Sequence, residues 1–444
     1  MRIPYKRQQG QVLIMVALSA IVLIASIGLA VDSGLGYLVK AKLNSAVDSA
    51  SLAAARAVTQ GTTEEAQAAS ARQAAKEFFD INFPSKYMMS TPVLKPIVVT
   101  FDKVEKGKII IDVSATATLP VSLMGVLGFK TLNVAASAQT IRKDLDMILV
   151  MDTSGSLKPN EDAVKLAGKS FLNKFNSTVD RVGLLHFASD AQIDVSIGTS
   201  RGFSRTNTEK AITGYTFAGG TNSAEGLWQA RKQLNDNIKQ ADRSSLRVIV
   251  FFSDGSPAAF SSYFPNTGNK CKTAGALATF TKLQSPALDG LYKVGVTNTD
   301  QTGDCDATKI TELPKWYNAN DSLQEFEIIT NTPRVVTKAV DSAQIQWTNV
   351  HRASRNLAEA IANKARAEGV YIFTLGMGAS LTAQEGPDKE YGQDLLRCLA
   401  NTADAPSRCR KSTQPVGLYC YAATESDLSP CFTRLASAIL RISK

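Results

Sequence analysis

The chain has 444 residues, which is too long for one ordinary hydrophobic core, so we expect two or three folded units. Hydrophobic residues make up 44% of it and charged residues 20%, as in globular proteins. The formal net charge is +9, but the basic residues are dispersed and form no Lys/Arg block. This distribution predicts a mildly basic, solvated surface and argues against a nucleic-acid-binding site.

Residues 12–31 form an uncharged, mostly apolar run near the N-terminus. At about 1.5 Å per residue, a helix of this length crosses a bilayer core of about 30 Å. Basic residues precede the run, so the positive-inside rule places residues 1–11 in the cytoplasm and everything after Asp32 outside it. The alternative is a signal peptide cleaved after Ala30. We favour a retained transmembrane helix, because the run exceeds a usual signal-peptide core; either interpretation exports the bulk of the chain.

The use of cysteine agrees with export. All six cysteines lie in the last two fifths of the chain, at Cys271, Cys305, Cys398, Cys409, Cys420 and Cys431. An even number outside the cytoplasm predicts disulfides, with fifteen possible pairings. Buried free thiols are an alternative, whereas a zinc site would need close Cys-x-x-Cys pairs, which are absent.

Residues 32–143 are predicted to form a membrane-proximal region. Residues 34–58 are Ala-rich and amphipathic and are expected to continue the membrane helix outward. A second helix is expected from Thr63 to Phe79.

Three strand-like runs follow this second helix, at 97–104, 109–119 and 132–141, with a hairpin turn at Lys106–Lys108. A long helix followed by a small antiparallel sheet is a pilin-like or adaptor layout. A spacer without a binding role has the same pattern.

Residues 144–444 are predicted to form an α/β domain with a doubly wound, mostly parallel sheet. Short buried runs alternate with segments of helical period, which is the pattern of such a fold. The strands are expected at 145–151, 181–187, 248–252 and 370–375, and the helices at 161–175, 223–234 and 354–367. In these sheets ligands bind beyond the carboxyl ends of the strands.

Residues 256–350 interrupt the alternation with a segment rich in Ser, Thr, Asn, Gly and Asp. Because a structureless loop of this length is unusual in a compact domain, we expect an inserted subdomain, with Cys271 and Cys305 as a candidate bridge. The insert leaves the sheet directly after Asp254 and is therefore expected beside whatever site that residue belongs to.

Three segments place acids and hydroxyls just after predicted strands or on a glycine-rich loop. They are Asp152-Thr153-Ser154-Gly155-Ser156, Gly219-Gly220-Thr221-Asn222 and Ser253-Asp254-Gly255. Oxygen ligands of this kind suit a hard divalent cation. Together the three segments predict one metal site.

These residues resemble the metal-ion-dependent adhesion site of von Willebrand factor A domains, over roughly residues 144–442 without the insert. The resemblance implies a Rossmann-like fold and five residues that hold Mg²⁺, or another divalent cation such as Mn²⁺ or Ca²⁺, directly or through water. Carried onto this sequence, they are Asp152, Ser154, Ser156, Thr221 and Asp254. Two carboxylates leave the cation with unneutralised charge, so an Asp or Glu of a protein partner can complete the coordination.

Two alternatives compete for the same residues. Asp152 and Ser154 could cap a helix beginning near Pro159, but this accounts for one hydroxyl only. Aspartate-nucleophile phosphotransferases need a second carboxylate where this chain has Ser154. A hydrolase would need a base, and of the two histidines His186 is expected in a strand and His351 at the surface before a helix. The sequence therefore predicts binding rather than catalysis, with no catalytic residues.

Residues 10–141 resemble TadG-like proteins of tight-adherence (Flp-type) pilus systems. The resemblance rests on the apolar helix, the segment Gly28-Leu29-Ala30-Val31-Asp32-Ser33-Gly34 and the Ala-rich stretch after it. TadG-like proteins often carry a C-terminal von Willebrand A domain. The expectation is a single-pass bacterial inner-membrane protein whose partners are pilus or envelope components; a surface adhesin without a pilus and a purely structural tether are the alternatives.

Overall fold

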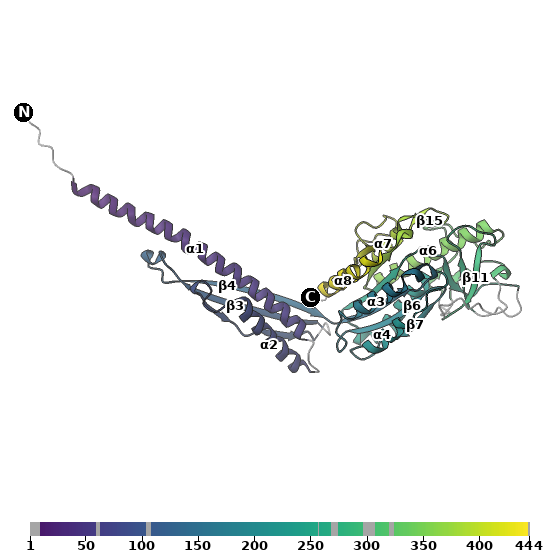
Figure 1. Cartoon of the computed structure of the whole chain (residues 1–444), viewed down its shortest axis with the longest axis horizontal. Helices are drawn as coiled ribbons and strands as arrows, with labels where there is room; N and C mark the ends of the chain where they lie inside the picture. Colours follow the sequence, from purple (N-terminus) through teal and green to yellow (C-terminus); the bar gives the residue numbers. More distant parts are fainter. Residues whose placement is uncertain are drawn as a thin grey trace, which may run out of the picture. The chain divides into compact units, whose positions relative to one another are not determined.

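The computed structural model describes residues 9–58, 63–103, 108–255, 257–267, 274–295, 307–318 and 324–442. The chain divides into two compact units, Met1–Arg142 and Lys143–Ser443. Each unit has its own hydrophobic core. Figure 1 shows the elements of both units.

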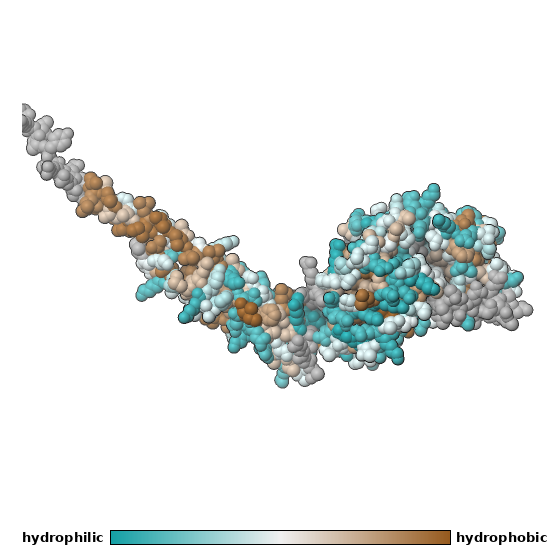
Figure 2. All heavy atoms as spheres, viewed as in Figure 1, coloured by the Kyte–Doolittle hydropathy of each residue, from teal (hydrophilic) through white to brown (hydrophobic). Residues whose placement is uncertain are grey.

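The N-terminal unit begins with one uninterrupted helix, α1 (Gln9–Ala57). Its first half exposes its apolar side chains, and Figure 2 shows hydrophobic surface along it. Its second half buries Val39, Leu43 and Ala46. In length and composition α1 is sufficient to span a bilayer, and it is the one such helix in the described part of the chain. The expectation that the helix continues beyond the apolar run is confirmed.

A second helix and a small sheet complete this unit. The elements are α2 (Glu64–Asn82), η1 (Tyr87–Met89), β1 (Thr91–Leu94), β2 (Val98–Phe101), β3 (Lys108–Pro120), η2 (Met124–Leu127) and β4 (Thr131–Lys143). Helix α2 starts where predicted, because the Thr63 side chain accepts a hydrogen bond from the Ala66 amide. Of the expected turn at Lys106–Lys108, only Lys108 lies within the described residues.

Strand β3 is the centre of this sheet. Strands β1 and β2 pair with its two halves along one edge, both antiparallel, and β4 pairs along the other. The predicted alternation holds, since Ile109, Ile111 and Val113 are buried while their neighbours are only partly so. These residues share one core with side chains of α1 and α2. Strand β1 was not predicted.

The second unit is built on a six-stranded sheet of order β17-β14-β8-β5-β6-β7. Its strands are β5 (Leu145–Asp152), β6 (Arg181–Phe187), β7 (Ala191–Val195), β8 (Leu246–Ser253), β14 (Val370–Met377) and β17 (Tyr419–Ala422). All neighbouring pairs are parallel except β6 with β7. The four predicted strands are therefore the four central ones, and β7 and β17 were missed at the edges.

Helices cover both faces of this sheet. They are α3 (Glu161–Leu172), α4 (Arg205–Thr213), α5 (Ser223–Asp236), α6 (Ala343–Ala367), α7 (Gly392–Ala400) and α8 (Glu425–Ile442). Three short 3₁₀ segments, η3 (Gly155–Asn160), η4 (Gln240–Asp242) and η6 (Ala379–Thr382), also belong to this unit. Along β5, Ile148 and Val150 pack with α5, α6 and α7, whereas Met147 and Leu149 pack with α3, α4 and α8. The predicted doubly wound α/β fold is confirmed.

The segment after β8 adds β9 (Ala259–Ser262), β10 (Gly275–Thr279), β11 (Leu288–Lys293), η5 (Ala307–Lys309), β12 (Trp316–Tyr317) and β13 (Phe326–Glu327). Strands β9 to β11 form an antiparallel sheet. Its Phe260 and Leu277 share a core with Ile148 of β5. The insert therefore extends the main core, and it also holds a small cluster of its own, Ala259, Ala276, Ala278 and Tyr292. Helix α6 begins at Ala343, before the expected position.

Two disulfides lie in the described residues, both near the C-terminus. Cys398 pairs with Cys409, and Cys420 pairs with Cys431, with Cα–Cα distances of 5.4 and 5.6 Å. They join α7 to the following loop and β17 to α8. The candidate bridge between Cys271 and Cys305 lies outside the described residues.

The expectation for one histidine was wrong. His351 was placed at the surface before a helix, but it is buried within α6, and its Nε2 lies 3.0 Å from the Phe280 carbonyl oxygen. Helix α6 begins further upstream than its sequence pattern indicated, so His351 falls in its interior, against the insert.

Candidate metal site

The predicted site residues follow two neighbouring parallel strands. Asp152 is the last residue of β5, and Asp254 comes directly after Ser253, the last residue of β8. Met151 pairs with Phe252 across the two strands. Because parallel strands present their carboxyl ends at the same edge, the two carboxylates reach one place.

Asp152 is fully buried and is held by two hydrogen bonds. Its Oδ1 accepts from the Ser154 amide at 2.8 Å, and its Oδ2 accepts from the Ser253 hydroxyl at 2.6 Å. The first bond turns the chain sharply after β5, and the second fixes the carboxylate against β8. Ser253 was not among the predicted residues, although it directly precedes Asp254.

The hydroxyls of the first motif face the second carboxylate. Ser156 Oγ donates to Asp254 Oδ1 at 3.0 Å, and Ser154 Oγ lies 3.5 Å from the same oxygen. The two serine hydroxyls are 3.2 Å apart. The alternative role of Ser154 as a helix cap is not observed, because its side chain makes no capping hydrogen bond to η3. The structure thus gathers Asp152, Ser154, Ser156 and Asp254 into one cluster.

Thr221 lies on the third loop, beside this cluster. A Cβ placed on Gly255 would lie 3.8 Å from Thr221 Oγ1, so the threonine hydroxyl adjoins the turn that carries Asp254. The loops are also joined through their backbones, since the Gly155 amide donates to the Gly219 carbonyl at 3.1 Å. All five predicted residues are therefore neighbours at one edge of the sheet.

Burial makes the two carboxylates unfavourable as a charged pair. Desolvation raises the pKa of Asp152 to about 6. The pKa of Asp254 is raised to about 8, by burial first and then by the charge of Asp152. A divalent cation would relieve both effects, because it supplies the positive charge that the surrounding protein does not.

The donor set suits a hard cation. Two carboxylates and three hydroxyls provide oxygen ligands only, which favours Mg²⁺, Mn²⁺ or Ca²⁺ over softer metals. Within the described ranges no cluster of three or more His, Cys, Asp or Glu side chains could hold a metal. Any cation here would therefore depend on the serine and threonine hydroxyls as well as on the acids.

The insert lies beside this edge, as predicted from its exit after Asp254. The Ala258 amide donates to the Thr221 carbonyl at 3.0 Å. A second buried acid, Asp190, accepts from Ser261 of β9 at 2.5 Å, and Tyr317 donates to Glu225 of α5. Burial, followed by the charge of Glu225, raises the pKa of Asp190 well above its usual value. These contacts attach the insert to the loop that carries Thr221, to the turn between β6 and β7, and to α5.

One further contact reaches the site from far along the chain. Ser380 of η6 donates a hydrogen bond from its hydroxyl to the Asp254 carbonyl oxygen. Neither Ser380 nor Asp190 carried a motif in the sequence. Their contacts join segments that are far apart in the sequence, so no local pattern of residues marks them.

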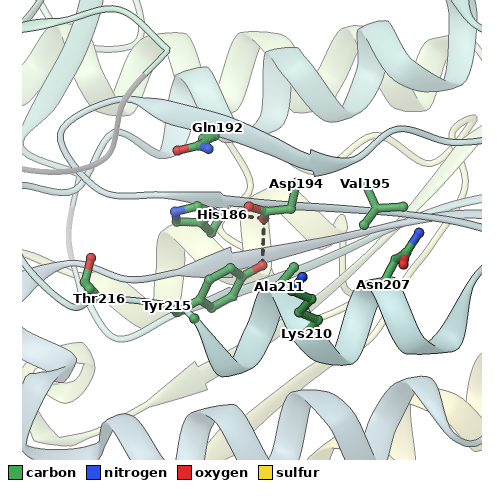
Figure 3. A pocket seen from close by; sticks show the side chains of 10 residues that line it. His186, Gln192, Asp194, Val195, Asn207, Lys210, Ala211, Tyr215 and Thr216 are labelled. Atoms are coloured by element: carbon green, nitrogen blue, oxygen red, sulfur yellow. Dashed lines mark hydrogen bonds and ion pairs between the residues drawn. The ribbon is translucent and has the colours of Figure 1, made fainter.

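A separate pocket of about 600 Å³ lies among β6, β7 and α4 (Figure 3). His186 Nδ1 is 2.9 Å from Asp194 Oδ2, and the Tyr215 hydroxyl donates to the same oxygen at 2.7 Å. Burial, and then the Asp194 charge, raises the pKa of Tyr215 well above its usual value, so the phenol keeps its proton. His186 is a strand residue, as predicted, and it belongs to this pocket.

Two family models match the chain. Residues 147–256 match the von Willebrand factor type A domain, and residues 10–57 match the family described as putative Flp pilus-assembly TadE/G-like. The first match contains all five candidate ligands. No curated protein matches the chain.

Solved structures with a related arrangement include two pilus proteins and a byssus protein. The pilus adhesin SpaC of Lactobacillus rhamnosus GG is 14% identical with a TM-score of 0.39, over 78% of this chain and 36% of SpaC. The von Willebrand domain of the pili tip protein Mfa5 of Porphyromonas gingivalis is 14% identical, with a TM-score of 0.38, over 68% and 96% of the two chains.

The third is proximal thread matrix protein 1 of the mussel byssus, with a zinc-occupied adhesion motif. It is 12% identical with a TM-score of 0.35, over 66% of this chain and 47% of that protein. The family matches and the fold give the result: this chain has a TadE/G-like N-terminal region followed by a von Willebrand factor type A domain.

Proposed function

We propose that this protein is a single-pass protein of the bacterial inner membrane that supports the assembly of a Flp-type pilus or surface adhesion. In this proposal it binds a protein partner through a divalent cation. The observation that carries the proposal is the cluster in which Ser154 and Ser156 face Asp254 while Asp152 lies buried beside them. Such a cluster of oxygens, at the ligand-binding edge of an α/β sheet, suits a cation that stays open to a partner.

The proposed ligands are Asp152, Ser154, Ser156, Thr221 and Asp254, acting directly or through water, and Mg²⁺ is the proposed ion. When bound, the cation would supply a Lewis-acidic position for an incoming carboxylate. With hydroxyls in place of further acids, the protein adds no negative charge beyond the two carboxylates, so an Asp or Glu of the partner could still bind the cation. The protein residues hold and orient the ion, and nothing in this role requires catalysis.

The proposed location follows from α1 and from the TadE/G-like match. The apolar first half of α1 would span the membrane with the N-terminus in the cytoplasm and the rest of the chain outside. The disulfides of the second unit agree with an oxidising compartment. The description of the N-terminal family supports pilus components as partners.

The test is recovery of partners from solubilised envelopes with and without a chelator. Full-length wild type, Asp152→Ala and the exposed-acid control Asp341→Ala serve as baits. We expect cation-dependent partners with wild type and the control, and none with Asp152→Ala. Equal recovery from all samples would contradict the proposal and leave a structural tether. Recovery only of ligands from outside the cell would instead identify an adhesin.

A further inference from the structure

The turn between β3 and β4 lies against the apolar half of α1. This hairpin tip, residues 123–130, contains η2. Gly128 caps the end of η2, and its φ of 90° suits glycine. Figure 1 shows β3 and β4 running beside α1, with their turn toward its N-terminal half. The hairpin therefore reaches back along the helix toward the membrane-spanning segment.

Three residues on one face of α1 receive the hairpin. Gly28, Asp32 and Gly36 are spaced by four residues, so they lie on the same side of the helix. A Cβ on Gly28 would lie 2.7 Å from Leu123 Cβ, and a Cβ on Gly36 would lie 2.4 Å from Leu132 Cδ2. A Cβ on Gly28 would also lie 2.9 Å from the Leu123 carbonyl carbon, so a side chain there would displace the hairpin backbone, whereas at Gly36 it would displace the end of the Leu132 side chain.

Asp32 fixes the hairpin tip to this face. It is buried, and its carboxylate accepts hydrogen bonds from the backbone amides of Ser122 at 3.0 Å, Leu123 at 3.0 Å and Met124 at 2.7 Å. Three amides bound to one carboxylate form a charge-assisted contact, which sets the tip at a defined height along α1. That height is the end of the uncharged 12–31 run.

The hairpin tip nevertheless leaves two large apolar side chains uncovered. Leu127 is 50% exposed and Phe129 is 53% exposed. On α1, the neighbours of Gly28, Ile27 and Leu29, are 55% and 52% exposed. Lys130 follows directly and is exposed. An apolar tip followed by a basic residue is the composition of a segment that enters the interface of a bilayer.

We infer that the hairpin tip is a second membrane contact, in which Leu127 and Phe129 enter the outer lipid interface beside α1. At about 1.5 Å per residue, Gly28 lies about 5 Å inside the end of the apolar run, a depth typical of interfacial insertion. The lipid bilayer is the occupant that the geometry favours, because the exposed surface of the tip adjoins the segment that the bilayer surrounds. This inference rests on the proposed membrane anchoring. It adds that the tip holds α1 at a fixed rotation and depth in the bilayer.

The test places a tryptophan at the tip of the full-length protein. Phe129→Trp is reconstituted into vesicles of phosphatidylcholine and phosphatidylglycerol whose acyl chains are brominated near the headgroup end, since bromine quenches adjacent tryptophan. Phe78→Trp is the matched control. Phe78 is 46% exposed and lies beside Leu52, which is about 30 Å beyond Asp32 along the helix axis. The wild-type emission from three tryptophans is subtracted.

We expect loss of most of the emission added by Phe129→Trp and no loss of that added by Phe78→Trp. Equal emission from both variants in protein that floats with the vesicles would overturn the inference and leave the anchoring intact. A blue-shifted but unquenched signal from Phe129→Trp would also overturn it, since it would show a protein partner over the tip. Protein that does not float would contradict the anchoring and the inference together.

Discussion

Ser156 Oγ donates a 3.0 Å hydrogen bond to Asp254 Oδ1, joining loops that lie 98 residues apart in the sequence. The bond brings the first motif and the turn after β8 into one cluster of side chains. Asp254 also lies close to a second buried carboxylate, Asp152, and burial followed by the charge of Asp152 raises the pKa of Asp254 to about 8. This imbalance of charge motivates the first prediction.

Asp254→Asn should stabilise the second unit when divalent cations are chelated. The substitution removes a buried acid whose ionisation is opposed by burial first and then by the charge of Asp152, and we expect a gain of at least about 1 kcal/mol in the free energy of unfolding. Urea unfolding of the full chain in detergent measures this, followed by tryptophan fluorescence, because Trp228, Trp316 and Trp347 all lie in this unit. Asp341→Asn is the control. A loss of stability in Asp254→Asn alone would contradict the argument.

Much of the site was predictable because its residues are local to strand ends. Asp152, Ser154 and Ser156 follow one apolar run, and Asp254 follows another, so the sheet topology alone brings them together. Ser380 and Asp190 were not predictable, since their contacts depend on how distant loops fold. The edge strands β7 and β17 were missed for another reason: they are short and lack the long apolar runs of the central strands.

Asp32→Ala should loosen the hairpin tip. Three backbone amides would lose their acceptor, and that of Met124 is buried, where an unsatisfied group costs about 1–3 kcal/mol. We expect trypsin to cleave after Lys130 at least about tenfold faster in detergent, the factor that corresponds to about 1.4 kcal/mol. Asp48→Ala, an exposed acid on the same helix, provides the control. Unchanged cleavage would show that the Asp32 contacts do not hold the tip.

The two C-terminal disulfides should be formed in cells and should stabilise the second unit. Each closes a short loop with a sequence separation of 11, and removing one is expected to cost about 3 kcal/mol. Alkylation of intact cells before lysis, followed by peptide mapping, should find Cys398, Cys409, Cys420 and Cys431 protected until reduction. Free thiols at these positions would contradict both the pairing and the location outside the cytoplasm.

His351 should make the second unit less stable in acid. Desolvation lowers the pKa of His351 to about 4, compared with about 6.5 in the unfolded chain. The unfolded state therefore binds the proton first, so the stability contributed by neutral His351 is complete above about pH 6.5 and is lost as the pH falls toward 4. Near pH 5 the loss is about 2 kcal/mol.

His351→Gln tests this pH dependence, because glutamine can still donate to the Phe280 carbonyl oxygen but does not titrate. As the pH falls from about 8 to 5, wild type should lose unfolding free energy relative to His351→Gln. Comparing the two proteins at each pH cancels the contributions of the other acids. Parallel pH profiles would show that His351 stays uncharged in both states or is charged in both.

The central claim is tested most directly by Mn²⁺ binding to the full-length protein, measured by electron paramagnetic resonance in detergent. The account predicts saturable binding at one site that Mg²⁺ competes away, that Asp341→Asn retains and that Asp152→Ala loses. Binding that persists unchanged in Asp152→Ala, or the absence of saturable binding in wild type, would contradict it.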